Sequence, residues 1–247
     1  MDERAFEQRG EKEREYFYDA VFIDSGGLSE AGGKFYPTDY RHGDEFGMLG
    51  GGIRLVAAVD LYLNTRARRF IFMTGLTEKN KARLGPDVPT EASVLGDKFQ
   101  RVLAGLQKRS DYQGRFDELE EPIVEGQERS YNTLTNIEEA LKAVQSSGYK
   151  RICFLSSNYH IPRYRALWDM VLKSKGIALP TEIDFIGAED VVKELEPGKY
   201  DEVIDKAYKT EAAKQRIENE ERGVRDIAEG RYAYKEFQLD ERSKGKD

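Results

Sequence analysis

The sequence is poor in the residues on which several protein classes depend. Its single cysteine, Cys153, lies inside an apolar run, so no disulfide can form within the chain. A cysteine in such a run is typically a small buried hydrophobic residue. There are only two histidines, His42 and His160. Neither has a partner at the spacing of metal ligands, so no metal site is predicted.

Long apolar runs are also missing, and no segment has the length of a membrane-spanning helix. Residues 1–15 are densely charged and have no apolar centre, which argues against a secretory signal. The formal net charge is -7, and Lys and Arg are interspersed with Asp and Glu. Nucleic-acid binding requires a basic patch, so it is not predicted. We expect a cytoplasmic protein without a membrane span.

Five short apolar segments alternate with helical patterns. This alternation is typical of an α/β fold, and it predicts a Rossmann-like three-layer sandwich with a mainly parallel sheet of about five strands. The apolar runs are continuous, as expected for strands buried on both faces. The expected strands are residues 19–23, 69–73, 122–124, 151–155 and 182–186. The expected helices start near residues 53 and 90, cover residues 134–144 and follow the turn that carries His160.

Three further segments flank or interrupt this pattern. Residues 1–15 are expected to form a charged arm before a domain of residues 16–200. Residues 201–247 are dense in mixed charge, which predicts an exposed helix and a tail. Residues 28–52 form a long glycine-rich connection that could act as a lid, with His42 as a solvated loop residue.

Polar residues follow four of the five predicted strands. Because the carboxyl ends of parallel strands meet at one edge of the sheet, these clusters are expected to form one ligand site. The four clusters are Asp24-Ser25-Gly26-Gly27, Thr74-Gly75, residues 125–136 and residues 156–163.

The cluster after the fourth strand carries the best candidates for chemistry. His160 is interpreted as a general acid or base, although a structural histidine is the alternative. Arg163 suits a bidentate clamp on a phosphate or carboxylate, whereas Arg165 fits a surface ion pair. Ser157 lies three residues before His160. That spacing does not establish a nucleophile and base, and no G-x-S-x-G elbow is present, so a serine hydrolase is the weaker interpretation.

Two other clusters carry candidate ligand contacts. The backbone amides of Gly26 and Gly27 could cradle an anion, or the pair could simply form a tight turn. Ser130, Thr133 and Asn136 follow each other at intervals of three across a predicted helix start. One of them could cap the helix. Three exceed what a cap needs, so we predict ligand contacts.

The motifs resemble, in their order along the chain, those of the YdcF/SanA/ElyC-like family, a domain of unknown function. The likeness covers residues 19–186, and its specific parts are S-Y-N-T-L-T-N and S-S-N-Y-H-I-P-R. The resemblance implies a Rossmann-like domain, a role in bacterial envelope biogenesis and an association with S-adenosylmethionine. The family's functional positions would fall here on Gly26, Gly27, Arg54, Gly75, Glu91, Ser130, Thr133, Asn136, Ser157, His160 and Arg163.

Two hypotheses follow. In the first, the chain is an enzyme, a hydrolase or transferase on phosphorylated or nucleotide-like substrates. Arg54 and Arg163 would bind the anion, His160 would carry a proton, and Glu91 would orient a hydroxyl or cation. In the second, the same edge binds S-adenosylmethionine or a nucleotide without turnover and regulates a partner. The sequence names neither the substrate nor a protein partner.

Overall fold

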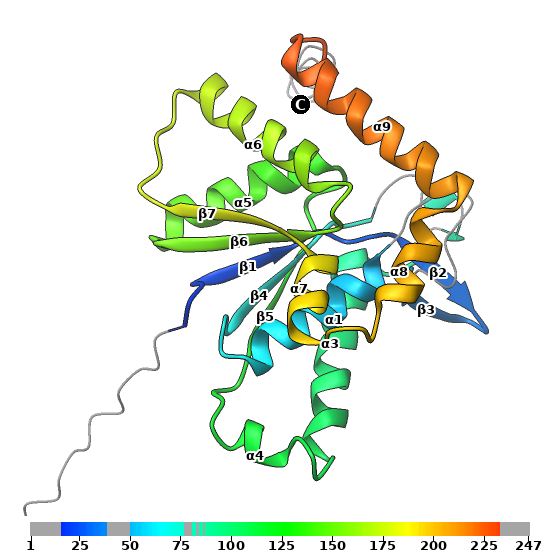
Figure 1. The fold of residues 1–247 in the computed structure, drawn as a ribbon. Helices are drawn as coiled ribbons and strands as arrows, with labels where there is room; N and C mark the ends of the chain where they lie inside the picture. Colours follow the sequence, from blue (N-terminus) through cyan, green and yellow to red (C-terminus); the bar gives the residue numbers. More distant parts are fainter. Residues whose placement is uncertain (1–15, 39–49, 77–80, 83, 86, 233–247) are drawn as a thin grey trace, which may run out of the picture.

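The central strands form where the sequence is most continuously apolar. The computed structural model describes residues 16–38, 50–76, 81–82, 84–85 and 87–232. Five strands form a parallel sheet in the order β5-β4-β1-β6-β7 (Figure 1). The predicted α/β fold and all five predicted strands are thereby confirmed. The strands are β1 (Ala20–Ile23), β4 (Arg69–Met73), β5 (Ile123–Gln127), β6 (Arg151–Ser156) and β7 (Glu182–Gly187).

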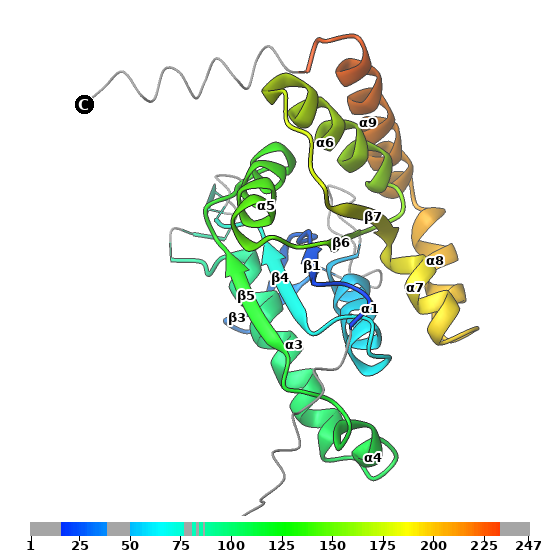
Figure 2. The same cartoon turned by 90° about the vertical axis from the view of Figure 1, so that its left-hand side faces the viewer.

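Helices cover both faces of the sheet and complete a Rossmann-like three-layer arrangement (Figures 1 and 2). One face carries α1 (Gly51–Leu63), α3 (Glu91–Gln107) and α7 (Ala188–Leu195), and the short α4 (Gln113–Phe116) follows α3. The other face carries α5 (Thr133–Ser147) and α6 (Ile161–Lys175). Alternate side chains of each strand enter opposite layers, so both layers of the core are apolar.

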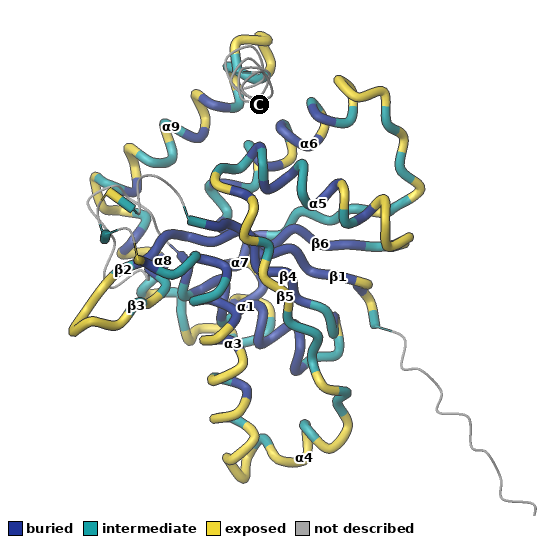
Figure 3. The backbone as a smooth tube through the Cα atoms, turned by 180° about the vertical axis from the view of Figure 1, so that it is seen from behind, coloured by how far each residue is buried: buried dark blue, intermediate teal, exposed yellow. Residues whose placement is uncertain are grey.

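Aromatic residues fill each layer of the core. Phe70 and Phe99 pack with ring centroids 4.9 Å apart on the α1–α3 side. Phe154 contacts Trp168 with centroids 5.1 Å apart on the α5–α6 side. Strands β1, β4 and β6 are buried almost throughout (Figure 3). The sheet therefore gives the loops at its carboxyl edge a rigid support.

The connection after β1 contains a hairpin that was not predicted. Strands β2 (Leu28–Ala31) and β3 (Lys34–Pro37) pair antiparallel across Gly32 and Gly33. Residues 39–49, including His42, lie outside the described residues, as does the predicted arm of residues 1–15.

The C-terminal region differs from the expected single exposed helix. Its described part, residues 201–232, contains two helices, α8 (Asp201–Tyr208) and α9 (Glu211–Ala228). Helix α9 crosses the carboxyl edge of the sheet and packs on α6 (Figure 1). The sequence predicted a tail here because most residues of α9 are charged or polar, and only a narrow stripe of the helix is buried. That stripe consists of Ala213, Glu220 and Gly223.

The strand order reverses beside β1. The chain adds β4 and β5 on one side of β1, then returns to add β6 and β7 on the other. Ligand sites of open α/β sheets lie outside the carboxyl ends of the strands at such a reversal. Among the described residues, no helix is long and apolar enough to cross a membrane.

Candidate functional site

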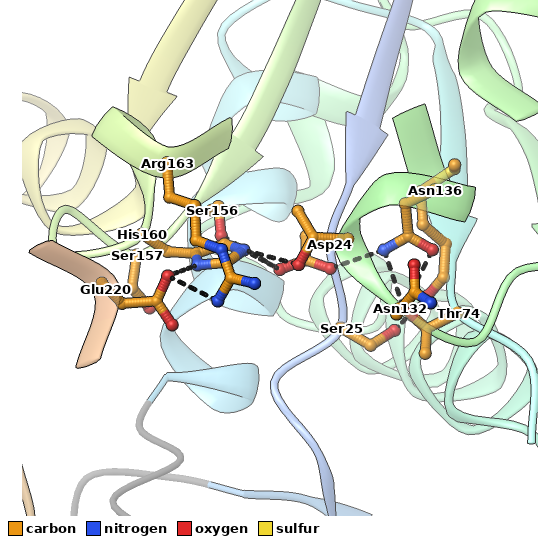
Figure 4. A network of polar contacts seen from close by, with 12 residues as sticks. Asp24, Ser25, Thr74, Asn132, Asn136, Ser156, Ser157, His160, Arg163 and Glu220 are labelled. Atoms are coloured by element: carbon orange, nitrogen blue, oxygen red, sulfur yellow. Dashed lines mark hydrogen bonds and ion pairs between the residues drawn. The ribbon is translucent and has the colours of Figure 1, made fainter. Parts of the chain in front are cut away.

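Asp24 lies at the centre of a buried polar network at this edge of the sheet (Figure 4). It directly follows β1, and its backbone amide still donates to Leu155 of β6. Its side chain Oδ1 accepts from Asn136 Nδ2 at 2.8 Å, and Oδ2 accepts from Ser156 Oγ at 3.3 Å. Oδ2 also lies 3.1 Å from Arg54 Nη1. A carboxylate that is only 7% exposed needs such partners to offset its lost hydration.

Arg54 enters the network from the first turn of α1. Its Nη1 donates to the carbonyl oxygens of Asp24 and Ser25, at 2.9 and 2.6 Å. Its Nε and Nη2 both donate to Ser157 Oγ, at 3.2 and 3.0 Å. The guanidinium is 2% exposed and joins the loops after β1 and β6. The resemblance implied an anion-binding arginine here, but the structure gives this arginine several protein acceptors.

His160 occupies the other side of Asp24, at the start of α6. Its Nδ1 lies 2.7 Å from Glu220 Oε2. Its Nε2 lies 3.5 Å from Asp24 Oδ2 and 3.4 Å from Thr133 Oγ1. The ring is 3% exposed, so both nitrogens are held by protein groups in a water-poor site. The structure thus places Thr133 and His160 together, as the strand-end argument predicted.

Glu220 comes from α9 and was not identified from the sequence. Burial alone would raise the pKa of its carboxyl, but the charges of His160, Arg216 and Arg163 outweigh burial and lower that pKa to about 2. Glu220 is therefore an anion at neutral pH and can only accept hydrogen bonds. It follows that His160 Nδ1 carries the proton of their hydrogen bond.

The environment of Glu220 explains how α9 approaches so closely. Arg216, one turn earlier, lies with Nη2 2.8 Å from Glu220 Oε1. Gly223 lies against the Arg163 side chain, and a Cβ at Gly223 would come within 3.0 Å of Arg163 Nε. The Arg–Glu pair and the glycine are visible in the sequence. Helix α9 holds several other acidic residues, however, and no pattern shows which one turns inward.

Arg163 is the second predicted anion clamp, and it lies between α6 and the C-terminal segment. Its Nη1 is 3.5 Å from Glu220 Oε2, and its guanidinium lies 4.9 Å from the centroid of the Tyr232 ring. Its Nη2 donates to the Tyr232 hydroxyl. Its Nε is buried without a hydrogen-bond partner. Arg163 therefore has one donor that the described protein groups leave unused.

Ser130, Thr133 and Asn136 at the start of α5 do not cap this helix. Asn132 is the N-cap of α5 and forms a capping box with Thr135. Asn136 instead contacts Asp24, and its Nδ2 also donates to Thr74 Oγ1 at 3.1 Å. Ser130 Oγ accepts from the Thr74 amide at 3.1 Å. Ser130, Thr133 and Asn136 therefore all contact protein groups at the edge of the sheet, and their ligand contacts stay a prediction.

Thr74 itself has an unusual backbone. Its φ is 88°, in the left-handed region that a β-branched residue rarely adopts. Such conformations cost of order 1–3 kcal/mol and persist where the surroundings enforce them. Here hydrogen bonds with Ser130, Asn136 and the Ala92 backbone amide hold Thr74 in place.

The predicted glycines and Glu91 serve chain packing. A Cβ at Gly26 would lie 2.5 Å from the Gly51 nitrogen, and one at Gly75 would collide with the Glu128 carbonyl oxygen. The Gly27 amide donates to Glu91 Oε2 at 2.9 Å. The close approach that these glycines allow is thus between protein segments. This corrects the expectation of a cradle in which the Gly27 amide faces a ligand.

Across the described ranges, no three His, Cys, Asp or Glu side chains form a group able to hold a metal ion.

No protein-family model matches the chain, and neither a curated protein nor a solved structure does.

Proposed function

We propose that the chain is an enzyme acting on a small anionic ligand, phosphorylated or nucleotide-like, at the carboxyl edge of its sheet. In this proposal His160 moves a proton. The observation that carries it is the arrangement of His160 between two carboxylates, with Glu220 2.7 Å from Nδ1 and Asp24 3.5 Å from Nε2.

The two carboxylates give the two ring nitrogens different tasks. Glu220 accepts the Nδ1 proton, so the proton that His160 takes from or gives to a ligand is the one on Nε2. Asp24 would stabilise the protonated ring, because its Oδ2 faces Nε2. A histidine oriented in this way is a general acid or base in the usual sense. A purely structural histidine needs neither a second carboxylate nor a hydroxyl beside Nε2.

The anionic character of the ligand is supported by the groups around the edge. Helices α1 and α6 both begin there without a side-chain cap, so their amino-terminal dipoles favour a negative charge. Arg163 Nε adds a buried donor without a partner. The resemblance to the YdcF/SanA/ElyC-like family supports the same edge, and a link to bacterial envelope biogenesis is part of the proposal on that ground.

A thermal-shift screen tests the ligand class. The purified protein is screened against nucleotides, sugar nucleotides, isoprenoid phosphates and S-adenosylmethionine. A ligand at a hundred times its Kd adds about 2.7 kcal/mol of stability. We expect a phosphorylated compound to raise Tm in the wild type, and the shift to be lost in Arg163→Ala.

The matched control is Arg165→Ala, an exposed arginine two residues further along the same helix. It should keep the full shift. A shift that survives Arg163→Ala, or a screen without any phosphorylated hit, would contradict the proposed ligand. Stabilisation by S-adenosylmethionine alone would favour the second hypothesis, in which the same edge binds its ligand without turnover.

A further inference from the structure

A cavity lies between α1, α3 and the segment after α7. Its volume is about 160 Å³, close to the roughly 150 Å³ of an engineered apolar cavity that holds benzene. Aliphatic side chains form much of its wall, among them Leu55, Val59, Val102 and Leu106. The cavity therefore has the size and surface for the apolar body of a small organic molecule.

One carboxylate lines this apolar wall. Asp60 lies on α1 six residues beyond Arg54, which places it about 9 Å further along the helix axis. It is 7% exposed, and its Oδ2 is buried without a hydrogen-bond partner. A buried acceptor without a donor is costly, and native proteins contain few of them. The Asp60 carboxylate beside the cavity thus lacks a hydrogen-bond donor.

The charged groups around Asp60 indicate whether a cationic or an anionic ligand would supply this donor. The charged groups facing Asp60 are Glu196 and Lys199 after α7 and Arg115 on α4, and Arg109 also lines the cavity. Lys199 is paired with Glu196, and Arg109 is paired with Asp111. Lys199 and Arg109 therefore have carboxylate partners of their own, whereas Asp60 Oδ2 has none. This asymmetry favours a cationic ligand over an anionic one.

We propose that this cavity binds a small primary amine, with its ammonium group on Asp60 and an apolar body of about the size of benzene against the aliphatic wall. Tyr112 and Tyr200 also line the cavity, and their rings already have cation–π contacts with Arg109 and Lys199. The proposal is independent of the function assigned to His160, because the two sites share no residue.

The probe is benzylamine, measured by isothermal titration calorimetry, with benzyl alcohol as its neutral counterpart. The wild type should bind benzylamine more tightly than benzyl alcohol at pH 8. Asp60→Asn keeps the shape of the side chain and removes its charge, and it should weaken benzylamine at least tenfold. Asp169→Asn, an exposed aspartate on α6, is the control and should bind like the wild type.

The same binding should depend on pH. Burial first, and then the charge of Glu196, raise the pKa of Asp60 to about 7, with Lys199 and Arg115 opposing them. The ionised fraction then falls from about 90% at pH 8 to about 10% at pH 6, so affinity should fall about tenfold. Affinity independent of pH over this range would overturn the role of Asp60.

A variant that fills the cavity distinguishes loss of the binding site from loss of the fold. Val102→Phe keeps Asp60 but occupies the cavity, and it should abolish benzylamine binding while the protein stays folded. Binding that persists in Val102→Phe or in Asp60→Asn would overturn the proposal. So would a wild type that does not bind benzylamine, since the cavity would then be a hydrated gap. His160→Asn should leave benzylamine binding unchanged, which separates this result from the fate of the proposed enzyme.

Discussion

Glu220 Oε2 lies 2.7 Å from His160 Nδ1, although the two residues are 60 positions apart in the chain. The contact joins the C-terminal helix α9 to the loop at the end of β6. It makes a helix that looked peripheral in the sequence a part of the candidate site, and it gives the histidine a defined orientation.

Glu220→Gln should destabilise the protein at neutral pH. The pKa of Glu220 in the folded state is about 2, below its usual value of 4.5. A lowered carboxyl pKa adds stability above pH 4.5 that is lost as the pH falls toward 2. We expect a loss of about 3 kcal/mol at pH 7, shrinking between pH 5 and pH 2.5.

Urea unfolding of both proteins at pH 7, 4 and 2.5 measures this difference. Glu221→Gln changes the exposed neighbour and should match the wild type throughout. A difference that does not change with pH would show that the charge of Glu220 contributes nothing.

Arg54→Met should be among the most destabilising substitutions in the chain. It leaves the buried carboxylate of Asp24 without its cation, and breaking a buried pair in this way typically costs about 3–5 kcal/mol. Adding Asp24→Asn should recover part of that loss. A double-mutant cycle by urea unfolding measures the coupling, which is expected to exceed about 1 kcal/mol. Strictly additive effects would contradict the pairing.

Gly75→Ala and Gly105→Ala should have opposite effects. A Cβ at Gly75 collides with the Glu128 backbone, whereas one at Gly105 on α3 has nothing within 4 Å. Alanine in an exposed helix is favoured over glycine by about 0.5–1 kcal/mol, so Gly105→Ala should raise Tm. Gly75→Ala should lower Tm by several degrees. Equal Tm values for the two variants would contradict the close approach at Gly75.

Asp60→Asn should stabilise the protein, and more so at higher pH. The folded-state pKa of about 7 lies above the usual 3.8. The wild type therefore loses stability as the pH rises from 4 to 8, and the amide variant does not. The advantage of Asp60→Asn should grow by about 3–4 kcal/mol over that range, as measured by urea unfolding. A constant difference between the two proteins would mean that Asp60 ionises normally.

The fold could be predicted because its signals are local. Continuous apolar runs marked each strand, and polar residues marked each carboxyl end. The hairpin of residues 28–37 was missed although its signal is present. Gly32 and Gly33 separate two short runs and both have positive φ, the combination that two-residue hairpin turns require.

The polar network of the site was only partly predictable. Its members at strand ends, such as Ser157 and His160, follow from topology. The pairing of Arg54 with Asp24 depends on how α1 packs beside β1, and the role of Glu220 depends on how α9 crosses the edge. Such pairings join distant segments, so no spacing within either segment reveals them.

Turnover by His160→Asn tests the central claim most directly. Wild type and variant are incubated with the ligand identified by thermal shift, product is followed by mass spectrometry, and Kd is measured by calorimetry. A general acid or base contributes about a hundredfold or more, so the variant should lose at least that much turnover while Kd barely changes. Turnover at the wild-type rate in His160→Asn, or a wild type that binds the ligand without converting it, would contradict the account.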